Sequence, residues 1–268
     1  MNSKIKFPLI MGIVNVTPDS FSDGGNFFSK ERAIEHALLL IDQGADIIDI
    51  GGESTRPGAN EVSELEEINR VVPVISEIKR IKPDIKISID TTKYNVALES
   101  VKAGADIIND ISGLTFEPRL AEIAAEYDKE LIIMHINGQP RTMQANPHYE
   151  NVVKEVFDFL FEKIKFAKNI GVKKIISDIG IGFGKNLNHN LTLLQNIEKF
   201  KELEAPILLG ISRKSFINHL LQIESPEERD LPTLLIHTML LSKNIDIIRV
   251  HNVKNIILLK ELHKALHN

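Results

Sequence analysis

The sequence of 268 residues contains no cysteine and no tryptophan. The absence of cysteine excludes disulfides, thiolate metal ligands and a cysteine nucleophile, and it favours a reducing compartment. Aromatic residues make up only 6% of the sequence, whereas hydrophobic residues make up 43% and charged residues 26%. This balance is typical of an ordinary globular protein with a sizeable core. We therefore expect a folded protein that does not depend on disulfides.

The sequence also lacks an excess of positive charge and a long hydrophobic run. Its net charge of −5, without a clustered basic face, argues against nucleic acid or membrane partners and favours a small molecule. No segment approaches the ~18 apolar residues of a membrane helix. The first residues resemble a secretion signal, but Pro8 and Asn15 interrupt the apolar run and no A-x-A cleavage site follows. We expect a cytoplasmic protein.

Short apolar runs alternate with longer amphipathic stretches along the whole chain, which is typical of βα units and a parallel sheet. The pattern predicts a single (β/α)8 TIM barrel of the α/β class, with residues 1–268 as one domain. A doubly wound open sheet is the alternative, and the absence of a G-x-G-x-x-G turn makes it less favoured. The eight predicted strands are LIMGIVNV ending near Val16, DIIDIGG from Asp46, KISIDT from Lys86, DIINDISG from Asp106, LIIMHI from Leu131, KIISDIG from Lys174, PILLGIS from Pro206 and DIIRVH from Asp246.

An internal repeat supports this interpretation. The phrase GADIIDI from Gly44 returns as GADIIND from Gly104, and NIDIIRV near the C-terminus is a looser third copy. When the three copies are aligned, Asp49, Asn109 and Arg249 occupy equivalent strand positions. Such similarity favours repeated βα units over two separate domains.

Polar residues follow nearly every predicted strand, and in a barrel the strand ends carry the reactive groups. Any one of them could be a helix cap or a turn residue, but together they predict a lined pocket. In order they are Asn15, Glu53 to Arg56, Asp90, Asn109 with Asp110, His135, Asp178, Ser212 to Lys214, and Arg249 with His251.

The residue types indicate what the pocket could hold. Carboxylates at Asp90 and Asp178, with the amide of Asn109, could form paired hydrogen bonds with the edge of a 2-amino-pyrimidinone ring. Asp90 could instead cap the following helix. The ammonium of Lys214 could polarise a ring carbonyl or nitrogen.

Other residues favour phosphate and metal binding. Arg249 and His251 alternate along the eighth strand, so both would face one side and, with Arg56, could hold a diphosphate. The amide oxygen of Asn15 would suit a hydrated Mg²⁺ shared with phosphates. The segment GIGFGK from Gly180 lacks the spacing of a nucleotide loop, so Phe183 is better interpreted as an apolar wall.

Eight blocks of the sequence resemble the dihydropteroate synthase family, in order and over almost the whole chain. They are MGIVNVTPDSFSDGG from Met11, GGESTRPGA from Gly51, ISIDT from Ile87, IINDISG from Ile107, MHINGQPRTMQ from Met134, DIGIGFGK from Asp178, GISRKSF from Gly210 and RVHNV from Arg249. The resemblance implies a barrel transferase of folate synthesis. Its reaction joins 6-hydroxymethyl-7,8-dihydropterin diphosphate to 4-aminobenzoate, giving 7,8-dihydropteroate and diphosphate.

The resemblance also implies roles for individual residues, a Mg²⁺ cofactor, a homodimer and binding of sulfonamide inhibitors. Asp90, Asn109, Asp178 and Lys214 would hold the pterin, Arg249 and His251 the diphosphate, and Asn15 the Mg²⁺. Phe21, Asp23, Phe183 and Ser212 would shape the 4-aminobenzoate pocket, and Thr55 with Arg56 would help to close the site. The residues expected to take part most directly in the chemistry are Asp178, Lys214, Arg249, Asp23 and Phe21.

Three departures from the usual family pattern are expected to matter. Ile179 stands where proline is usual, and Asn252 replaces an aspartate that could orient His251 or cap the last helix. Residues 231–244 carry bulky side chains where small ones are usual. Such side chains would alter helix packing, which argues against the usual homodimer. An inactive pterin-binding module and a methyltetrahydrofolate:corrinoid methyltransferase-like enzyme are the alternative functions.

Overall fold

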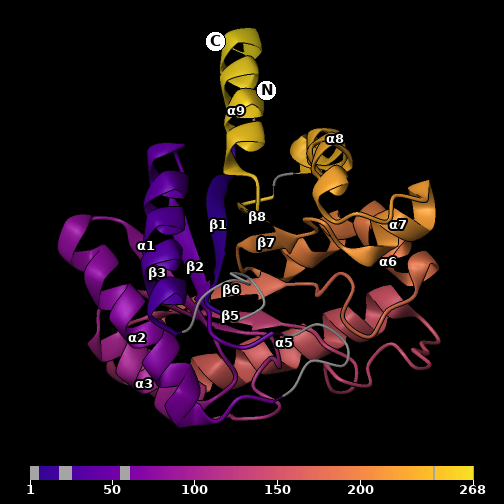
Figure 1. Cartoon of the computed structure of the whole chain (residues 1–268). Helices are drawn as coiled ribbons and strands as arrows, with labels where there is room; N and C mark the ends of the chain where they lie inside the picture. Colours follow the sequence, from indigo (N-terminus) through magenta and orange to yellow (C-terminus); the bar gives the residue numbers. More distant parts are fainter. Residues whose placement is uncertain (1–5, 18–25, 55–60, 244, 268) are drawn as a thin grey trace.

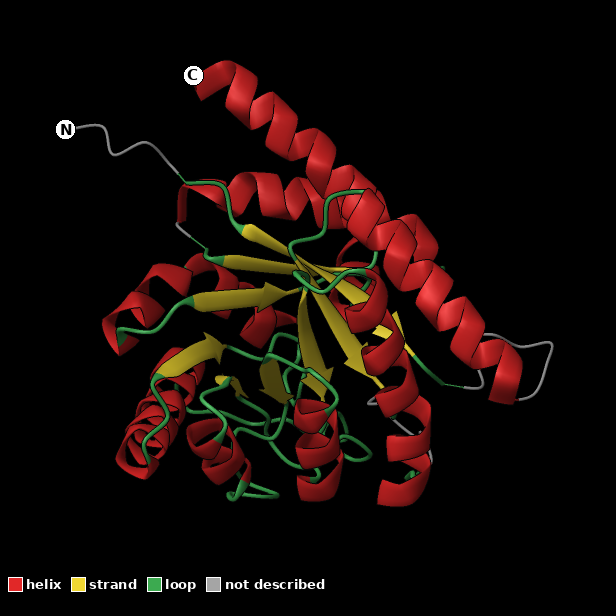
Figure 2. Ribbon diagram, turned by 90° about the vertical axis from the view of Figure 1, so that its left-hand side faces the viewer, coloured by secondary structure: helices red, strands yellow, loops and turns green. Residues whose placement is uncertain are grey.

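The structure is a computed structural model that describes residues 6–17, 26–54, 61–243 and 245–267. Eight parallel strands pair in sequence order, and the first also pairs with the last, so the sheet closes into a barrel. Helices alternate with the strands and surround them (Figures 1 and 2). This confirms the single (β/α)8 barrel that the sequence predicts.

Each predicted strand is present, and its ends differ from the prediction by a few residues at most. The strands are β1 (Leu9–Asn15), β2 (Ile47–Gly51), β3 (Lys86–Asp90), β4 (Ile107–Asp110), β5 (Glu130–Met134), β6 (Lys174–Asp178), β7 (Ile207–Gly210) and β8 (Ile247–Val250).

The helices cover the outside of the barrel. They are α1 (Asn26–Asp42), α2 (Glu64–Ile81), α3 (Tyr94–Lys102), α4 (Leu120–Glu126), α5 (Val152–Ile170), α6 (Leu187–Gln195), α7 (Ser215–Leu221), α8 (Asp230–Leu240) and α9 (Val253–His267), with 3-10 turns η2 (Ile197–Leu203), η3 (Glu227–Arg229) and η4 (Leu241–Lys243). Among the described residues, no helix is both long and apolar enough to cross a membrane.

The repeated Gly-Ala-Asp phrase has the same structural role in two places. Gly44 and Gly104 follow α1 and α3 with φ of +106° and +115°, a backbone conformation that glycine adopts without steric cost. The aspartates Asp46, Asp106 and Asp246 then each accept a backbone N–H from the preceding strand, at 2.8, 3.0 and 2.8 Å. The repeat therefore tethers β2, β4 and β8 to their neighbours at the strand entrances.

The core has two large parts and one small cluster that contains Met134. The larger part lies between the strands and the surrounding helices, and includes the outward-facing residues Ile48, Ile108 and Ile248. The smaller part fills the inside of the barrel with one apolar layer, made of Met11, Ile47, Ile107, Ile132, Ile176, Leu208 and Ile247. Alternation of side chains along the strands separates the two parts.

Candidate active site

The strand alternation that builds the inner apolar layer also builds the site. Two residues further along a strand, a side chain faces the same way, one layer nearer the carboxyl ends. There five of the seven strands that form the apolar layer carry polar or small residues, while Ile13 and Met134 remain apolar. Following Ile47, Ile107, Ile176, Leu208 and Ile247 of the inner layer, the residues at this level are Asp49, Asn109, Asp178, Gly210 and Arg249.

Arg249 links carboxylates from two other strands. Its Nε lies 2.6 Å from Oδ2 of Asp49, and its terminal nitrogen lies 2.9 Å from Oδ2 of Asp90. Asn109 donates from Nδ2 to the same Asp49 carboxylate at 3.2 Å. The three aligned positions of the internal repeat thus meet inside the barrel, around a fully buried Asp49.

Asp49 is missing from the sequence-based site, although the repeat alignment contains the signal that could have found it. A carboxylate equivalent to Asn109 and Arg249 must face the same interior. Asp49 can orient the Arg249 guanidinium because it takes one edge of that group, while Asp90 takes another.

Asp90 lies in an electrostatically unfavourable place for a negative charge. Burial, together with the nearby charge of Asp49, raises the pKa of Asp90 to about 7, and Arg249 opposes the rise. Two carboxylates share one guanidinium here, so protonation of Asp90 is possible near neutral pH.

Asp178 and Lys214 form the opposite side of the site. Oδ1 of Asp178 accepts the backbone N–H of Gly180 at 2.7 Å. Burial raises the pKa of Asp178, and Lys214 opposes this rise most strongly. Burial also lowers the pKa of Lys214 to about 8, against the attraction of Asp178. Each charge therefore favours the ionised form of the other.

Gly210 leaves room between these charged groups. A Cβ atom at this position would lie 3.8 Å from Oδ2 of Asp178 and 3.8 Å from Cδ of Arg249. A larger side chain would occupy the space that both groups border. The glycine therefore keeps the centre of the barrel mouth open.

Phe183, which the sequence predicts to be an apolar wall, is partly buried. It packs against a small buried cluster of Ile111, Met134, Ile136 and Met143. The ammonium of Lys214 lies 4.5 Å from the centre of the Phe183 ring and donates a hydrogen bond to the carbonyl of Ile181. The cation and the aromatic wall thus adjoin each other.

The three side chains of the Ser-Arg-Lys segment after β7 do not all face the site. Ser212 Oγ lies 2.9 Å from Nδ1 of His251, which places a hydroxyl and an imidazole together at the ends of β7 and β8. Arg213 instead forms a two-pronged contact with Asp230 of α8, at 2.7 and 2.9 Å. The Arg213 guanidinium therefore secures α8, whereas Lys214 faces the site.

Asn15 ends β1 beside Asp90. A Cβ atom at Gly51 would lie 3.9 Å from both Oδ1 of Asn15 and Oδ2 of Asp90. The amide oxygen of Asn15 therefore borders the mouth of the barrel, where the sequence places a metal ligand. Four other predicted site residues, Phe21, Asp23, Thr55 and Arg56, lie outside the described residues.

Lys93 secures both flanks of the segment that contains Thr55 and Arg56. Its ammonium lies 3.0 Å from Oε2 of Glu53 and donates to the carbonyl of Val62 at 2.7 Å. It also contacts the buried Glu67 at 2.6 Å. These contacts of Lys93 were not predicted from the sequence, because the residues involved are far apart along the chain.

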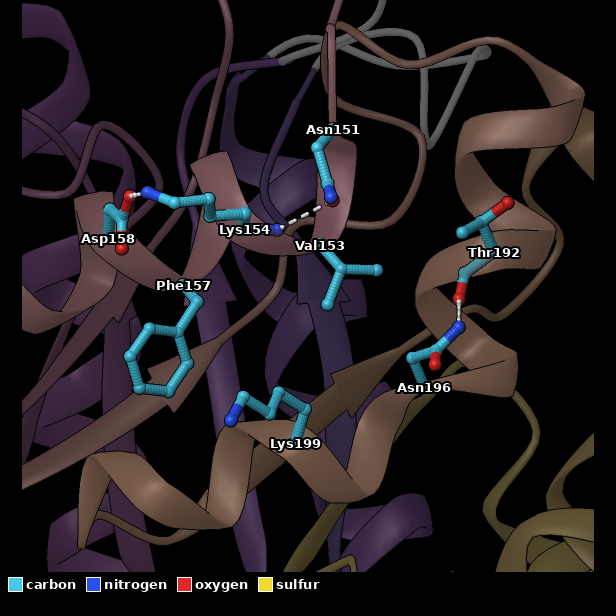
Figure 3. A pocket seen from close by; sticks show the side chains of 8 residues that line it. All are labelled: Asn151, Val153, Lys154, Phe157, Asp158, Thr192, Asn196 and Lys199. Atoms are coloured by element: carbon cyan, nitrogen blue, oxygen red, sulfur yellow. Dashed lines mark hydrogen bonds and ion pairs between the residues drawn. The ribbon is translucent and has the colours of Figure 1, made fainter.

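Two cavities differ in their relation to these residues. One, of about 490 Å³, includes Asp90 and extends from the barrel mouth over Glu53, Lys93, Phe116 and Arg141. The other, of about 650 Å³, lies outside the barrel between α5, α6 and η2 (Figure 3). Figure 3 shows two pairs of its polar groups bonded to each other, Lys154 with Asp158 and Asn196 with Thr192. The first cavity therefore adjoins the candidate site through Asp90, whereas the second lies apart from it.

Two of the departures fit the structure without visible disruption. Ile179 is fully buried in the core between strands and helices. Asn252 retains a capping role, because its Oδ1 accepts the backbone N–H of Asn255 at 3.1 Å in the first turn of α9. Its amide also donates to Asp230 at 2.9 Å.

Comparison with known proteins identifies the family. A family model described as pterin binding enzyme matches residues 11–251. The chain belongs to the pterin-binding enzyme family. A curated dihydropteroate synthase of Escherichia coli is 47% identical over 252 residues, which cover 93% of this chain and 88% of that protein. The family predicted from the sequence motifs is confirmed.

Solved structures of the family agree with the fold. A Yersinia pestis dihydropteroate synthase in complex with a sulfonamide drug has a TM-score of 0.90 and 41% identity, covering 99% of this chain and 96% of that chain. A Xanthomonas albilineans dihydropteroate synthase with 4-aminobenzoic acid has a TM-score of 0.91 and 39% identity, covering 98% and 94%. Both likenesses extend over the complete barrel.

Proposed function

We propose that this protein is a dihydropteroate synthase. It joins 6-hydroxymethyl-7,8-dihydropterin diphosphate to 4-aminobenzoate and releases 7,8-dihydropteroate and diphosphate. The observation that carries the proposal is the constellation of Asp90, Asn109, Asp178, Lys214 and Arg249 at the mouth of the barrel. Family membership and the ligands named for related structures support the same reaction.

The pterin ring binds between the two sides of this constellation. Asp178 presents a buried carboxylate that already accepts one backbone N–H and can accept the ring N–H groups with its other oxygen. Asn109 and Asp90 border the ring from the opposite side, and Lys214 donates to a ring oxygen or nitrogen. The space left by Gly210 lets the flat ring lie against Arg249.

The reaction needs no covalent enzyme intermediate. The bond between the exocyclic carbon and the diphosphate oxygen breaks, and diphosphate leaves with the electron pair. The arylamine nitrogen forms the new carbon–nitrogen bond and then releases a proton to solvent. Positive charge that develops on the exocyclic carbon spreads into the pterin ring, where an ionised Asp178 stabilises it.

The leaving diphosphate binds near the ends of β7 and β8. His251 and Ser212 lie together there, and Arg249 adds a positive charge further inside the barrel. The oxygen of Asn15 at the same mouth fits a hydrated Mg²⁺, a hard ion that prefers oxygen ligands and shares them with phosphates. When bound, this ion would neutralise charge on the departing diphosphate.

The 4-aminobenzoate binds beside Phe183 and Ser212. Phe183 offers the aromatic face, and the neighbouring Lys214 marks the boundary with the pterin. We assign Phe21, Asp23, Thr55 and Arg56 to the same end of the site from the sequence motifs. Lys93 supports the assignment of Thr55 and Arg56, because it fixes the residues on both sides of them.

We also propose that the protein is a homodimer through α8 and α9. These helices are neighbours (Figure 1). Both carry exposed apolar residues at intervals of four. They are Leu231, Leu235 and Met239 on α8 and Leu258, Leu262 and Leu266 on α9. Bulky residues in the unusual 231–244 segment therefore face outward, where a second copy could cover them.

Two broader assignments remain predictions. We propose that residues 1–268 function as one domain, which the extent of the family match supports. We also propose a cytoplasmic location, for which the cysteine-free sequence is the support.

A diphosphate-release assay tests the proposed function. Purified protein is supplied with Mg²⁺, the pterin diphosphate and 4-aminobenzoate, and each component is omitted in turn. Release that requires both substrates supports the synthase. Binding of the pterin diphosphate without release would favour the inactive module, and Ile179 and Asn252 would then be changed first to the usual family residues.

A further inference from the structure

The segment 180–184, between β6 and α6, has an unusual hydrogen-bonding pattern. Each of its five main-chain carbonyls accepts a hydrogen bond from a side chain. The donors are Lys185 to Gly180 and Phe183, both at 2.9 Å, Lys214 to Ile181, Gln144 to Gly182 and Tyr149 to Gly184 at 2.9 Å. The backbone of this segment is therefore held by side chains rather than by regular secondary structure.

Lys185 occupies the centre of this arrangement. It is 2% exposed, and besides the two carbonyls it contacts Nδ1 of His135 at 2.9 Å. A fourth acceptor, the carbonyl of His135, lies farther away at 3.4 Å. The three close acceptors match the three protons of an ammonium group, so these contacts favour the charged form of Lys185, although burial lowers its pKa well below the usual value. Toward a charged Lys185, which has only donors, His135 accepts at Nδ1, and burial and the adjacent Lys185 keep this histidine neutral by lowering its pKa.

The loops after β5 and β6 meet backbone to backbone at the same place. A Cβ atom at Gly180 would lie 1.8 Å from the carbonyl oxygen of His135, and one at Gly184 would lie 2.3 Å from that of Asn137. Both glycines have positive φ, of +65° and +63°. Close approach of the two loops leaves Lys185 enclosed between them.

We propose that Lys185 is a positioning residue for the active site. Its ammonium holds segment 180–184 in the shape that places the Phe183 ring and the Ile181 carbonyl against Lys214. This inference rests on the proposed function, because Phe183 and Lys214 border the two substrates there. The lysine of the GIGFGK motif thus binds main-chain carbonyls of its own segment.

Replacement of Lys185 by methionine tests this role. Lys185→Met keeps most of the length and removes the charge and the donors. The variant should lose about 100-fold in kcat/KM, with KM for 4-aminobenzoate raised, because small displacements of positioning groups have effects of this size. Lys185→Arg, which restores a cation and donors, should recover part of the loss.

A destabilised control separates positioning from general stability. Val172→Ala removes buried volume at the opposite end of β6, and it should lower Tm while leaving KM for 4-aminobenzoate close to that of the unmodified protein. If Lys185→Met folds and keeps its kcat/KM within about twofold of the unmodified protein, below the loss expected for displacement, the proposal is wrong. If that variant does not fold, Lys185→Gln takes its place in the same comparison.

Hydrogen exchange provides a second readout that does not need activity. Backbone amides of residues 180–184 should exchange faster in the Lys185 variant, while those of the barrel strands keep their rates. Unchanged exchange in this segment would overturn the proposal. An unmodified protein that releases no diphosphate would instead contradict the proposed function, and the exchange result would still decide the role of Lys185.

Discussion

Replacing Asp90 by asparagine should make the protein more stable and less active. The pKa of Asp90 is raised from its usual 3.8 to about 7, a difference of about 3 pH units. At about 1.4 kcal/mol for each unit, ionised Asp90 lowers the free energy of unfolding by up to about 4 kcal/mol. The side chain is 15% exposed, so solvent screens part of this, and we expect about 2 kcal/mol.

The effect of Asp90 on the free energy of unfolding should depend on pH. Folded protein binds the Asp90 proton more tightly than unfolded protein, so this carboxyl reduces stability progressively as pH rises from about 4 to about 7. Asp90→Asn removes that slope. Its advantage over the unmodified protein should therefore be near zero at acidic pH and reach about 2 kcal/mol at pH ~8.

Reversible urea unfolding over this pH range measures the difference, with the exposed Asp84→Asn as a control for the loss of one charge. The Asp90→Asn variant should also lose at least about 10-fold in kcat/KM, since it lacks a charged partner of Arg249 and a pterin contact. The electrostatic account of Asp90 would be refuted if the free energies of unfolding of Asp90→Asn and of the unmodified protein changed in parallel with pH. It would also be refuted if the variant were less stable than the unmodified protein at alkaline pH.

Three further predictions concern other parts of the account. Asp178→Asn should slow the single-turnover rate more than it weakens binding of the pterin diphosphate, and an unchanged rate would contradict its role toward the developing cation. Because the pKa of Lys214 is lowered to about 8, kcat/KM should fall as pH rises past that value, and Lys214→Arg should move the fall to higher pH. Leu235→Glu should convert the proposed dimer to a monomer in light scattering, whereas the same change at Leu39, exposed on α1, should not.

The barrel could be predicted from sequence because its signal is local and repeated. Eight apolar runs each form a strand, and the Gly-Ala-Asp phrase marks strand entrances in the structure. Alignment of the repeat also placed Asn109 and Arg249 at equivalent strand positions, and in the structure both contact Asp49. These features depend on neighbouring residues, so one sequence is enough to find them.

The partners of the charged groups could not be predicted in the same way. Asp49 and Arg249 are 200 residues apart and meet only when the barrel closes. Arg213 and Lys214 adjoin in sequence, yet Arg213, which has a positive φ, pairs with Asp230, whereas Lys214 faces the site. The role of Lys185 likewise depends on the contact between two loops. Such pairings follow from tertiary geometry, which residue types alone do not determine.

A single-turnover experiment tests the central claim most directly. The protein, in excess over the pterin diphosphate, is mixed with Mg²⁺ and 4-aminobenzoate, and the products are identified by mass. The account predicts one 7,8-dihydropteroate for each pterin diphosphate consumed, and a much slower yield from Asp178→Asn. Protein that binds the pterin diphosphate but forms no dihydropteroate would contradict it.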